Sequence, residues 1–483
     1  MGERLRALMS RRTFHLGLGA GVLAGAAGLV ALRPRFRAEA QPSPQTCRGA
    51  VPTTDSGTWQ AIARQPAAPV TFPLRPVVGQ RFLVDAAGRP FLLVGDTAWS
   101  LIAQLSREDC ELYLDDRQAR GFNTVLVNLI EHKFADQAPR NMYGDRPFEP
   151  DGDFSAPNDR YFDHAAWVLS SAARRGILVL LAPAYLGTGG GDEGWYQKML
   201  ACGPDKLRDY GRYVGRRFRD FDNIIWVDGG DYDPPDARLS QAVSDGIRDI
   251  IPHSTHTAHN APDTDPVDFW KERGIPVSID ALYTYAPIAV AAEPLIAKHD
   301  MPYLLIESRY ENEHDGTALR TRIQAWQAML SGASGQVFGN HPIWHYNAPA
   351  AHPQPMPWKQ ALDSAGARSI SSMRDFLLAL PWSRLEPDRQ NQLLVGGVLT
   401  GHFRATAARS HDKTLAVVYL PSPREVVLDL TQMATSHVGV RWFDPANGRF
   451  FGAEPQSLAA SKQQTLRAPA CSADGDWVLL LTA

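Results

Sequence analysis

The chain has 483 residues and a formal net charge of -3 at pH 7. Its first 40 residues carry seven arginines and two acids, so the remaining 443 residues have a formal net charge of -8. A mildly acidic chain of this kind has no electrostatic basis for binding nucleic acid. Its length is sufficient to bury a large core, which predicts one large domain and a smaller one.

The N-terminal 40 residues have the pattern of a twin-arginine export signal. Arg11 and Arg12 precede Phe14, and the run Leu16–Leu32 contains no charged residue. Ala38 and Ala40 provide a small-residue cleavage site. We therefore expect the twin-arginine translocase as a partner during export and a periplasmic or secreted mature protein. The alternative is an uncleaved membrane anchor, because three arginines follow the apolar run closely.

The four cysteines are scattered along the chain and form no metal-type cluster in the sequence. The twin-arginine route carries proteins that have already folded in a reducing cytoplasm, so the stability of this protein is not expected to depend on disulfides. The four cysteines are Cys47, Cys110, Cys202 and Cys471.

Residues 41–79 are rich in Pro, Ala, Thr and Gln, which predicts a linker laid over the surface. In residues 80–380, short apolar runs then alternate with helical patterns, and eight such alternations favour a (β/α)8 TIM barrel over an open sheet. The clearest helical patterns are at Tyr161–Gly176 and Leu319–Ala333. The strands are expected at Phe91–Thr97, Thr124–Ile130, Ile177–Tyr185, Ile224–Asp231, Thr255–Asn260, Ser278–Tyr285, Tyr303–Glu307 and Gly335–Asn340.

Residues 381–483 contain short strand patterns separated by turn-forming residues and no long helical pattern. This texture predicts a C-terminal antiparallel β-sandwich that supports the barrel. Its strands are expected at Val395–Phe403, Thr414–Leu420, Glu425–Leu430, Val438–Phe443 and Trp477–Leu481.

Two of the predicted barrel strands end in a carboxylate, at Asp231 and at Glu307. In a barrel of parallel strands, the carboxyl ends of the strands carry the catalytic groups. Hydrolysis of a glycosidic bond needs one acid that protonates the leaving oxygen and a second carboxylate that attacks or stabilises the sugar. The pair therefore predicts a glycoside hydrolase, whereas the alternative is that both acids stabilise strand ends or pair with Arg309.

A series of motifs resembles the apiosidase-like glycoside hydrolases and the collagen-binding-type domain that accompanies them. The resemblance implies a TIM barrel whose acid/base is the Asp of a Gly-Gly-Asp sequence and whose nucleophile is a Glu on a later strand, which places these roles on Asp231 and Glu307. It also implies a retaining enzyme that removes a pentose side chain, apiose-like or another furanoside, from a plant cell-wall polysaccharide. The motifs are Val94–Trp99, Gly121–Asn123, Asn223–Trp226, Gly229–Asp231, Glu307–Glu311, Gly332–Gly335, Arg441–Pro445 and Asp476–Leu480.

Two departures from the family pattern affect the acid/base assignment. Asp228 stands where the family more often has an apolar residue, and Ile306 stands where a Gly commonly precedes the Glu. Because strand side chains alternate, positions 228 and 231 face opposite sides, and the two preceding glycines favour Asp231 as the inward residue. Asp228 remains the alternative acid/base.

Other residues at the predicted strand ends are candidates for substrate binding, although packing or helix capping would also explain each of them. Aromatic side chains there could stack on a sugar ring, and polar ones could bind hydroxyl groups. The candidates are Asp96, Trp99, Asn128, Tyr185, His259, Tyr283, Tyr285, Tyr310, His341 and Trp344.

Two other functional classes remain open from the sequence. A non-catalytic carbohydrate-binding or matrix-binding protein would not need two convergent acids. A metal-dependent polysaccharide deacetylase or lyase would need a ligand set assembled from distant residues, because the sequence contains no HExxH or similar motif. We therefore expect a monomer that acts on an oligosaccharide or polysaccharide without metal or cofactor.

Overall fold

A computed structural model describes residues 60–66, 69–348, 355–470 and 472–483. The predicted export signal lies outside these residues. Within them, no helix is long and apolar enough to cross a membrane. Cys110 and Cys202 are free thiols, and Cys47 and Cys471 lie outside the described residues.

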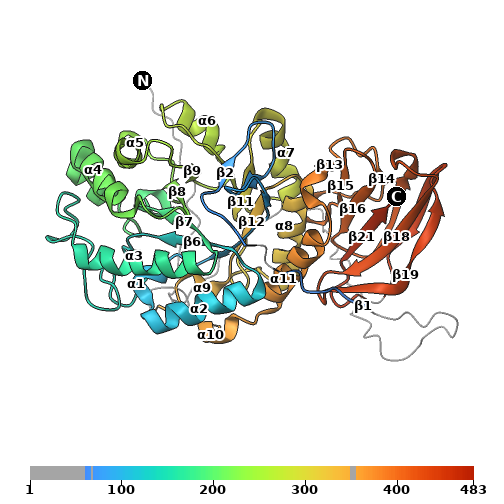
Figure 1. Cartoon of the computed structure of the whole chain (residues 1–483), viewed down its shortest axis with the longest axis horizontal. Helices are drawn as coiled ribbons and strands as arrows, with labels where there is room; N and C mark the ends of the chain where they lie inside the picture. The colour runs from blue at the N-terminus through green and yellow to red at the C-terminus, as the bar shows by residue number, and fades with distance from the viewer. Residues whose placement is uncertain (1–59, 67–68, 349–354, 471) are drawn as a thin grey trace, which may run out of the picture. The chain divides into compact units, whose positions relative to one another are not determined.

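Eight parallel strands form a nearly closed barrel in the order β10, β11, β12, β5, β6, β7, β8 and β9 (Figure 1). At the closing edge, the backbone N–H of Ser278 donates to the carbonyl oxygen of His256 at 2.9 Å, and the Thr257 hydroxyl donates to the Ile279 carbonyl at 2.8 Å. The predicted TIM barrel is therefore confirmed. The strands are β5 (Leu93–Thr97), β6 (Thr124–Asn128), β7 (Leu178–Ala182), β8 (Ile224–Gly229), β9 (His256–His259), β10 (Asp280–Tyr283), β11 (Tyr303–Glu307) and β12 (Gly335–Phe338).

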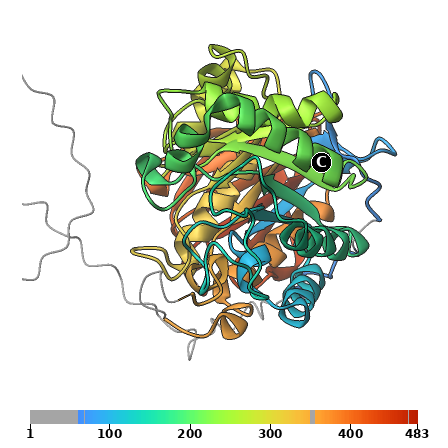
Figure 2. The same ribbon diagram turned by 90° about the vertical axis from the view of Figure 1, so that its left-hand side faces the viewer.

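Helices cover the outside of the barrel, and α4 and α5 pack against each other beside it (Figure 2). The predicted helix at Tyr161–Gly176 is α3, whose N-cap is Asn158, and the predicted helix at Leu319–Ala333 is α8, whose N-cap is Thr317. Both caps accept a hydrogen bond from the first turn of their helix, which explains why these helices begin before the predicted positions. The helices are α1 (Leu101–Gln104), α2 (Arg107–Arg120), α3 (Asp159–Arg174), α4 (Tyr196–Phe218), α5 (Arg238–Ile250), α6 (Pro266–Lys271), α7 (Ile288–Lys298), α8 (Ala318–Leu330), α9 (His341–Trp344), α10 (Trp358–Ala361) and α11 (Ala365–Leu378).

The segment before the barrel is partly ordered into strands. Residues Gln60–Ala61 form β1, which pairs with a C-terminal strand, and β2 (Arg75–Pro76), β3 (Leu83–Val84) and β4 (Pro90–Phe91) form a small antiparallel sheet. Apolar side chains of this sheet join the cluster inside the barrel, next to the beginning of β5. The segment therefore packs against the end of the barrel where the strands begin.

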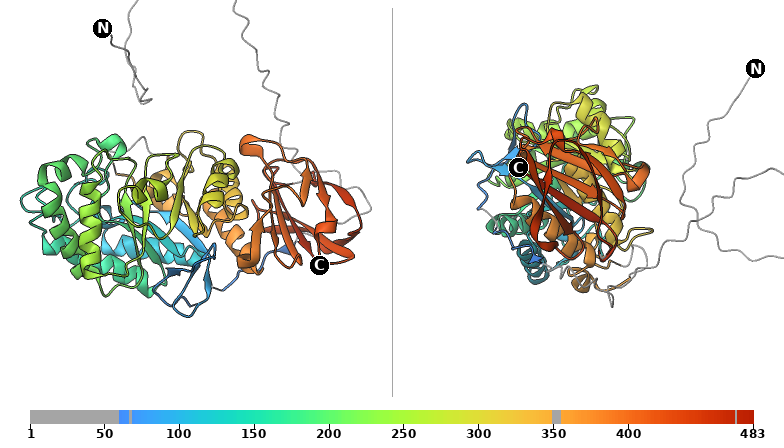
Figure 3. Two further views of the ribbon diagram at one scale, coloured as in Figure 1. Left: turned by 90° about the horizontal axis from the view of Figure 1, so that it is seen from above. Right: turned by 90° about the vertical axis from the view of Figure 1, so that its right-hand side faces the viewer.

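The C-terminal part contains a seven-stranded and a three-stranded antiparallel sheet with an apolar core between them (Figure 3). Four of the five predicted strands are confirmed within one or two residues, but the strand predicted at Val395–Phe403 is wrong. That strand ends at Gly396, because Gly397 has a φ of +75° and a 3-10 turn follows at Gly401–Phe403. The strands are β13 (Leu385–Pro387), β14 (Leu394–Gly396), β15 (Thr406–Ser410), β16 (Leu415–Leu420), β17 (Glu425–Asp429), β18 (His437–Asp444), β19 (Arg449–Ala459), β20 (Gln463–Arg467) and β21 (Trp477–Thr482).

A buried ion pair joins the barrel to the C-terminal sheets. Arg322 on α8 donates to Asp476 through Nε at 2.7 Å and through Nη2 at 2.8 Å, and the Tyr419 hydroxyl donates to the same carboxylate at 2.9 Å. Trp326, one turn further along α8, stacks on Tyr419 with ring centroids 5.8 Å apart. Breaking such a buried pair is costly because the remaining charge has no partner, so this contact fixes the two parts against each other.

Candidate active site

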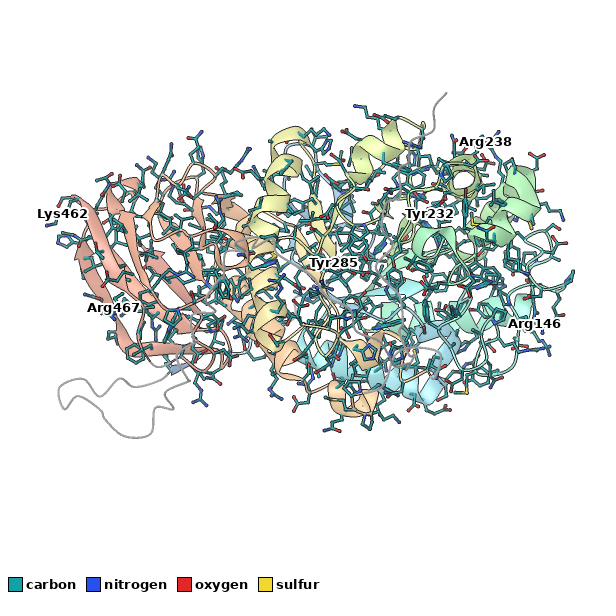
Figure 4. The ribbon with its side chains drawn as sticks, turned by 180° about the vertical axis from the view of Figure 1, so that it is seen from behind. Arg146, Tyr232, Arg238, Tyr285, Lys462 and Arg467 are labelled. Carbon is teal, nitrogen blue, oxygen red and sulfur yellow. The ribbon has the colours of Figure 1, made fainter. Side chains whose placement is uncertain are left out.

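The two predicted catalytic acids face each other at the carboxyl ends of β8 and β11. One oxygen of Asp231, one oxygen of Glu307 and one ring nitrogen of His259 all lie within 4.8 Å of one another. The three residues come from segments far apart in the sequence, and the parallel strands bring their ends to one mouth. Tyr285, which contacts Glu307, is labelled in Figure 4 on the barrel part of the chain.

Asp231 reaches the mouth because the backbone turns sharply after β8. Gly229, Gly230 and Asp231 have φ values of +91°, +130° and +50°. A Cβ atom on Gly230 would overlap the ring of Tyr185, so only glycine allows this close approach. The Gly230 N–H donates to the carbonyl oxygen of His259 at 2.6 Å, which anchors the turn to β9.

Asp231 is held by Tyr185 and His259, and its side chain stays partly open to solvent. The Tyr185 hydroxyl donates to Oδ2 at 2.8 Å, and the backbone N–H of Asp231 donates to Nδ1 of His259 at 3.1 Å. The side chain is 21% exposed, and Oδ1 has no hydrogen-bond partner among the described residues. Oδ1 itself is buried, so the exposed part of the side chain lies elsewhere on the group.

A break in strand pairing turns Glu307 to the inner face of the barrel. Leu282 pairs with Leu305 and Tyr283 with Glu307, so the pairing skips Ile306. Ile306 and Tyr283 belong to the interior cluster, and strict alternation after Ile306 would have directed residue 307 outward. The irregularity places Glu307 on the same face as Tyr283, towards the mouth.

Glu307 is buried and accepts three hydrogen bonds. Oε2 accepts from the Tyr310 hydroxyl at 3.0 Å and from Nε2 of His259 at 3.1 Å. Within the described part of the chain, Oε1 accepts one hydrogen bond, from the Tyr285 hydroxyl at 3.4 Å. Burial and the neighbouring Asp231 charge raise the pKa of Glu307, and the bonds from His259 and Tyr310 oppose this rise. Oε1 is thus the less saturated oxygen and the better placed to react.

His259 contacts both acids and is completely buried. Because Nδ1 accepts the Asp231 N–H, the proton of the neutral ring resides on Nε2, which donates to Glu307. Burial lowers the pKa of His259, but the hydrogen bond and the charge of Glu307, together with the charge of Asp231, outweigh burial and raise it above its usual value. Nδ1 is thereby engaged with the backbone of Asp231, and Nε2 is engaged with the carboxylate of Glu307.

Aromatic side chains surround the two acids. The Trp99 ring lies 5.4 Å from His259 and 5.8 Å from Tyr185, and its Nε1 donates to the Tyr310 hydroxyl at 3.2 Å. Tyr283 packs against His259 with ring centroids 4.8 Å apart, and the hydroxyls of Tyr283 and Tyr285 lie 2.8 Å apart. Most of the aromatic residues predicted at the strand ends therefore gather around the acids.

Trp344 lies close to this group, and the ring of His341 on the same helix packs against Trp344 with ring centroids 6.5 Å apart. Trp344 packs against the interior cluster that contains Trp99, and its ring lies 5.0 Å from Phe134. The buried His341 ring lies 5.0 Å from His345. The structure thus brings Trp344 to the wall of the mouth and gives no contact between His341 and the two acids among its described interactions.

The expectation that Asp96 binds substrate needs correction. Its side chain faces the helices outside the barrel, where it accepts hydrogen bonds from Tyr113 at 2.8 Å and from Arg117 at 3.3 Å. It is fully buried, and this burial raises its pKa to about 6 against the effect of Arg117. Asp96 therefore stabilises the packing of α2 on β5 instead of lining the mouth.

Asp228 also faces away from the mouth. Its Oδ2 lies 3.0 Å from Nδ1 of His256 and accepts from the Ser244 hydroxyl of α5 at 3.2 Å. The alternative acid/base is thus separated from Glu307 by the barrel wall.

Asn128 lies at the end of β6, as expected. It donates to Glu131 at 3.3 Å, while its Oδ1 has no partner among the described residues.

The alternative pairing of the two acids with Arg309 has no support in the observed contacts of Arg309. Arg309 does not pair with either acid, but lies over the Tyr285 ring at 4.4 Å and forms an ion pair with Asp315 at 3.1 Å. The position of Arg309 two residues after Glu307 was the only sequence feature that pointed to it as a neighbour of the site.

The Gly-rich segment at Gly187–Gly191 is held in place, because Gln197 donates to the Gly190 carbonyl at 2.7 Å.

Two groups have the spacing of metal ligands, but their hydrogen bonds serve other purposes. In the first group, Nδ1 of His259 accepts from Asp231 and its Nε2 proton is directed at Glu307, so neither nitrogen offers a lone pair to an ion shared with these acids. The second group comprises Asp265, Asp268 and His299, and Lys298 donates to Asp265 at 3.0 Å. The same ammonium group also donates to Asp268, so Lys298 already partners both carboxylates of that cluster.

Comparisons with known proteins identify a family for each of the two parts of the chain. A family model described as "Apiosidase-like, catalytic domain" matches residues 78–384, and one described as "Putative collagen-binding domain of a collagenase" matches residues 387–482. No curated protein sequence matches the chain significantly.

Solved structures share the fold. A glycoside hydrolase family 5 protein from Bacteroides vulgatus ATCC 8482 is similar with a TM-score of 0.74 and 21% identity, over 85% of this chain and 93% of that chain. A structure titled "Glycoside hydrolase" is similar with a TM-score of 0.73 and 20% identity, over 85% of this chain and 96% of that chain. The match to the catalytic family covers well over half of the chain, which therefore belongs to the apiosidase-like family of glycoside hydrolases.

Proposed function

We propose that this protein is an exported, retaining glycosidase that removes an apiose-like or other furanoside pentose side chain from a plant cell-wall polysaccharide. The observation that carries the proposal is the close approach of Asp231 and Glu307, whose nearest oxygens lie within 4.8 Å. Retaining glycosidases hold their carboxyl groups about 5 to 5.5 Å apart, whereas inverting enzymes need about 6.5 to 9.5 Å to admit a water molecule. Nearest oxygens this close are compatible with the retaining separation, which is defined between the two carboxyl groups.

In the proposed first step, Oε1 of Glu307 attacks the anomeric carbon of the sugar. Asp231 donates its proton to the leaving oxygen at the same time, so the aglycone departs as an alcohol. Tyr310 and His259 hold Oε2 of Glu307, which fixes the direction of attack. A glycosyl ester of Glu307 results.

In the second step, Asp231 acts as the base. It removes a proton from water, which attacks the anomeric carbon and breaks the ester bond to Glu307. The two inversions together retain the configuration of the sugar. The partial exposure of Asp231 supports this role, because one residue must contact first the leaving oxygen and then the incoming water.

The two acids can be tested separately with aryl glycosides of different leaving groups. Glu307→Gln should abolish turnover on every substrate, because it removes the nucleophile while keeping the side-chain shape. Asp231→Asn should keep the first step on a good leaving group and lose it on natural linkages, and added azide should restore turnover. Equal losses on good and poor leaving groups in both variants, together with earlier melting, would show that the acids only stabilise the strand ends.

The same assays separate the other functional classes. A binding protein would release no sugar from any aryl glycoside or pectic oligosaccharide, and a metal-dependent enzyme would lose activity in a chelator. We expect release of a pentose that is unaffected by the chelator. Identification of the released sugar decides between apiose and other furanosides.

The export route is a separate proposal that rests on the N-terminal sequence. Replacing Arg11 and Arg12 together by Lys should leave the precursor in the cytoplasm, because the twin-arginine receptor reads the guanidinium pair. Unchanged export would favour the general secretory route. A mature N-terminus near Gln41 would exclude the uncleaved anchor, and the mature protein is expected to be a monomer.

A further inference from the structure

We propose that His259 is a positioning residue whose two ring nitrogens control different catalytic acids: Nδ1 sets the backbone of Asp231, and Nε2 orients Glu307. This inference rests on the proposed two-acid mechanism. It replaces the expectation that His259 binds substrate, because the imidazole is buried and both of its nitrogens are already engaged with the enzyme.

The first half of the inference concerns the turn that carries Asp231. Asp231 has a φ of +50°, in a region that L residues seldom adopt without support. His259 supplies two acceptors to this turn, its carbonyl oxygen for the Gly230 N–H and its Nδ1 for the Asp231 N–H. His259 therefore accepts hydrogen bonds from two consecutive N–H groups. Its backbone carbonyl binds the N–H of Gly230, and its ring binds the N–H of Asp231 itself.

The second half concerns the orientation of the nucleophile. The Nε2 proton and the Tyr310 hydroxyl both donate to Oε2 of Glu307. With two donors on one oxygen, the carboxylate cannot rotate without losing both bonds, and Oε1 stays directed to the mouth. The bond from His259 also opposes the rise in the pKa of Glu307 that burial causes, so it helps to keep the nucleophile ionised.

The ring can serve both acids only in one tautomer and one orientation. Trp99 at 5.4 Å and Tyr283 at 4.8 Å pack against the imidazole and hold its plane.

His256 provides a natural comparison on the same strand. It is equally buried, but it faces outward to Asp228 and Ser244 and contacts neither catalytic acid.

Two substitutions separate the two nitrogens. An Asn amide lies near the position of Nδ1 and can still accept the Asp231 N–H, whereas a Gln amide reaches the position of Nε2 and can still donate to Glu307. His259→Asn should lower kcat/KM by about 10- to 100-fold, by the same factor for good and poor leaving groups, since it removes a hydrogen bond to a charged nucleophile. Its acidic pH limb should move to higher pH, because the hydrogen bond that opposes the raised pKa of Glu307 is lost.

His259→Gln should show a different pattern. It keeps the donor to Glu307 and releases the turn of Asp231, so substrates with a good leaving group should react nearly as in the wild type. Substrates with a poor leaving group should lose about 10- to 100-fold in kcat/KM, because they depend on a correctly placed general acid. The matched control is His256→Asn, which should lower thermal stability without changing the ratio between good and poor leaving groups.

The outcomes distinguish this inference from the proposed function. If Glu307→Gln and Asp231→Asn behave as described above but both His259 variants lose activity equally on all leaving groups with an unchanged pH limb, the inference fails and the two-acid mechanism stands. If Glu307→Gln remains active, the proposed function fails first. Should either variant not fold, 15N-histidine NMR of the wild type at the pH of the kinetic assays decides. A proton on Nδ1, in the neutral or the charged ring, would overturn the inference, and a proton on Nε2 alone would support it.

Discussion

Replacing Gly230 by Ala should disable the enzyme without touching either catalytic side chain. The residue has a φ of +130°, and an added Cβ would overlap Cδ2 of Tyr185 and lie 2.9 Å from the Leu186 nitrogen. Holding a residue other than Gly in such a conformation costs about 1–3 kcal/mol. Displacing Tyr185 also removes its hydrogen bond to Asp231, a contact with an ionisable group that is worth about 1.5–3 kcal/mol. We therefore expect the free energy of unfolding to fall by about 2.5–6 kcal/mol.

The effect on catalysis should exceed the effect on stability. A displacement of about 1 Å in a catalytic group costs on the order of 100-fold in rate, so kcat/KM of Gly230→Ala should fall by about that factor on substrates with poor leaving groups. Denaturant unfolding and steady-state kinetics measure the two quantities on the same preparation.

The matched control for this variant is Gly176→Ala. Gly176 follows α3 with a φ of +66°, and no atom lies within 4 Å of an added Cβ, so only the backbone strain of about 1 kcal/mol should remain. Its kinetics should equal those of the wild type. If Gly230→Ala proves as active as this control and equally stable, the close packing of the turn against Tyr185 does not position Asp231.

Two further predictions concern pH. Tyr310→Phe removes a hydrogen bond that opposes the raised pKa of Glu307, so the acidic limb of kcat/KM should shift to higher pH, and an unchanged limb would contradict the role of Tyr310. Asp280 is buried away from the mouth, and burial, with a further contribution from the Asp265 charge, raises its pKa to about 7. Since its unfolded value is about 3.9, the stability that wild-type Asp280 provides below pH 4 is lost as pH rises towards 7, to a total of about 4 kcal/mol. Asp280→Asn should therefore stabilise the protein strongly in thermal melts at pH 8 and much less at pH 5, and equal gains at both pH values would contradict the raised pKa.

The sequence was sufficient for the barrel because each strand is a short apolar run between helical patterns. It also placed both acids at strand ends, and the two glycines before Asp231 gave a physical reason to prefer it to Asp228. Alternation shows that neighbouring residues face opposite sides, but it does not show which side is inside. Asp96 was therefore assigned to the wrong face, and its partner Arg117 is 21 residues away.

Other features depend on contacts that the sequence does not display. The skipped pairing at Ile306, which directs Glu307 inward, is a property of two strands together and has no marker in either one. β19 in the C-terminal part was missed because its sequence contains Gly and Pro, and β20 was missed because its sequence is mostly polar. Pairing with neighbouring strands defines both. The bridging role of His259 likewise requires the positions of two other strands.

The partners of the carboxylates give a physical reason for assigning catalysis to one pair of acids. Asp96 is bound to the guanidinium of Arg117, a fixed charge that no step of a reaction would neutralise. Asp231 and Glu307 are held by phenol hydroxyls, a backbone interaction and the imidazole of His259. A glycosidase needs one acid that gains and loses a proton in every cycle and one that loses its charge on forming an ester, so both must be held by groups that tolerate the neutral form. A fixed cation would stabilise the ionised form of such an acid throughout the cycle and oppose each of these steps.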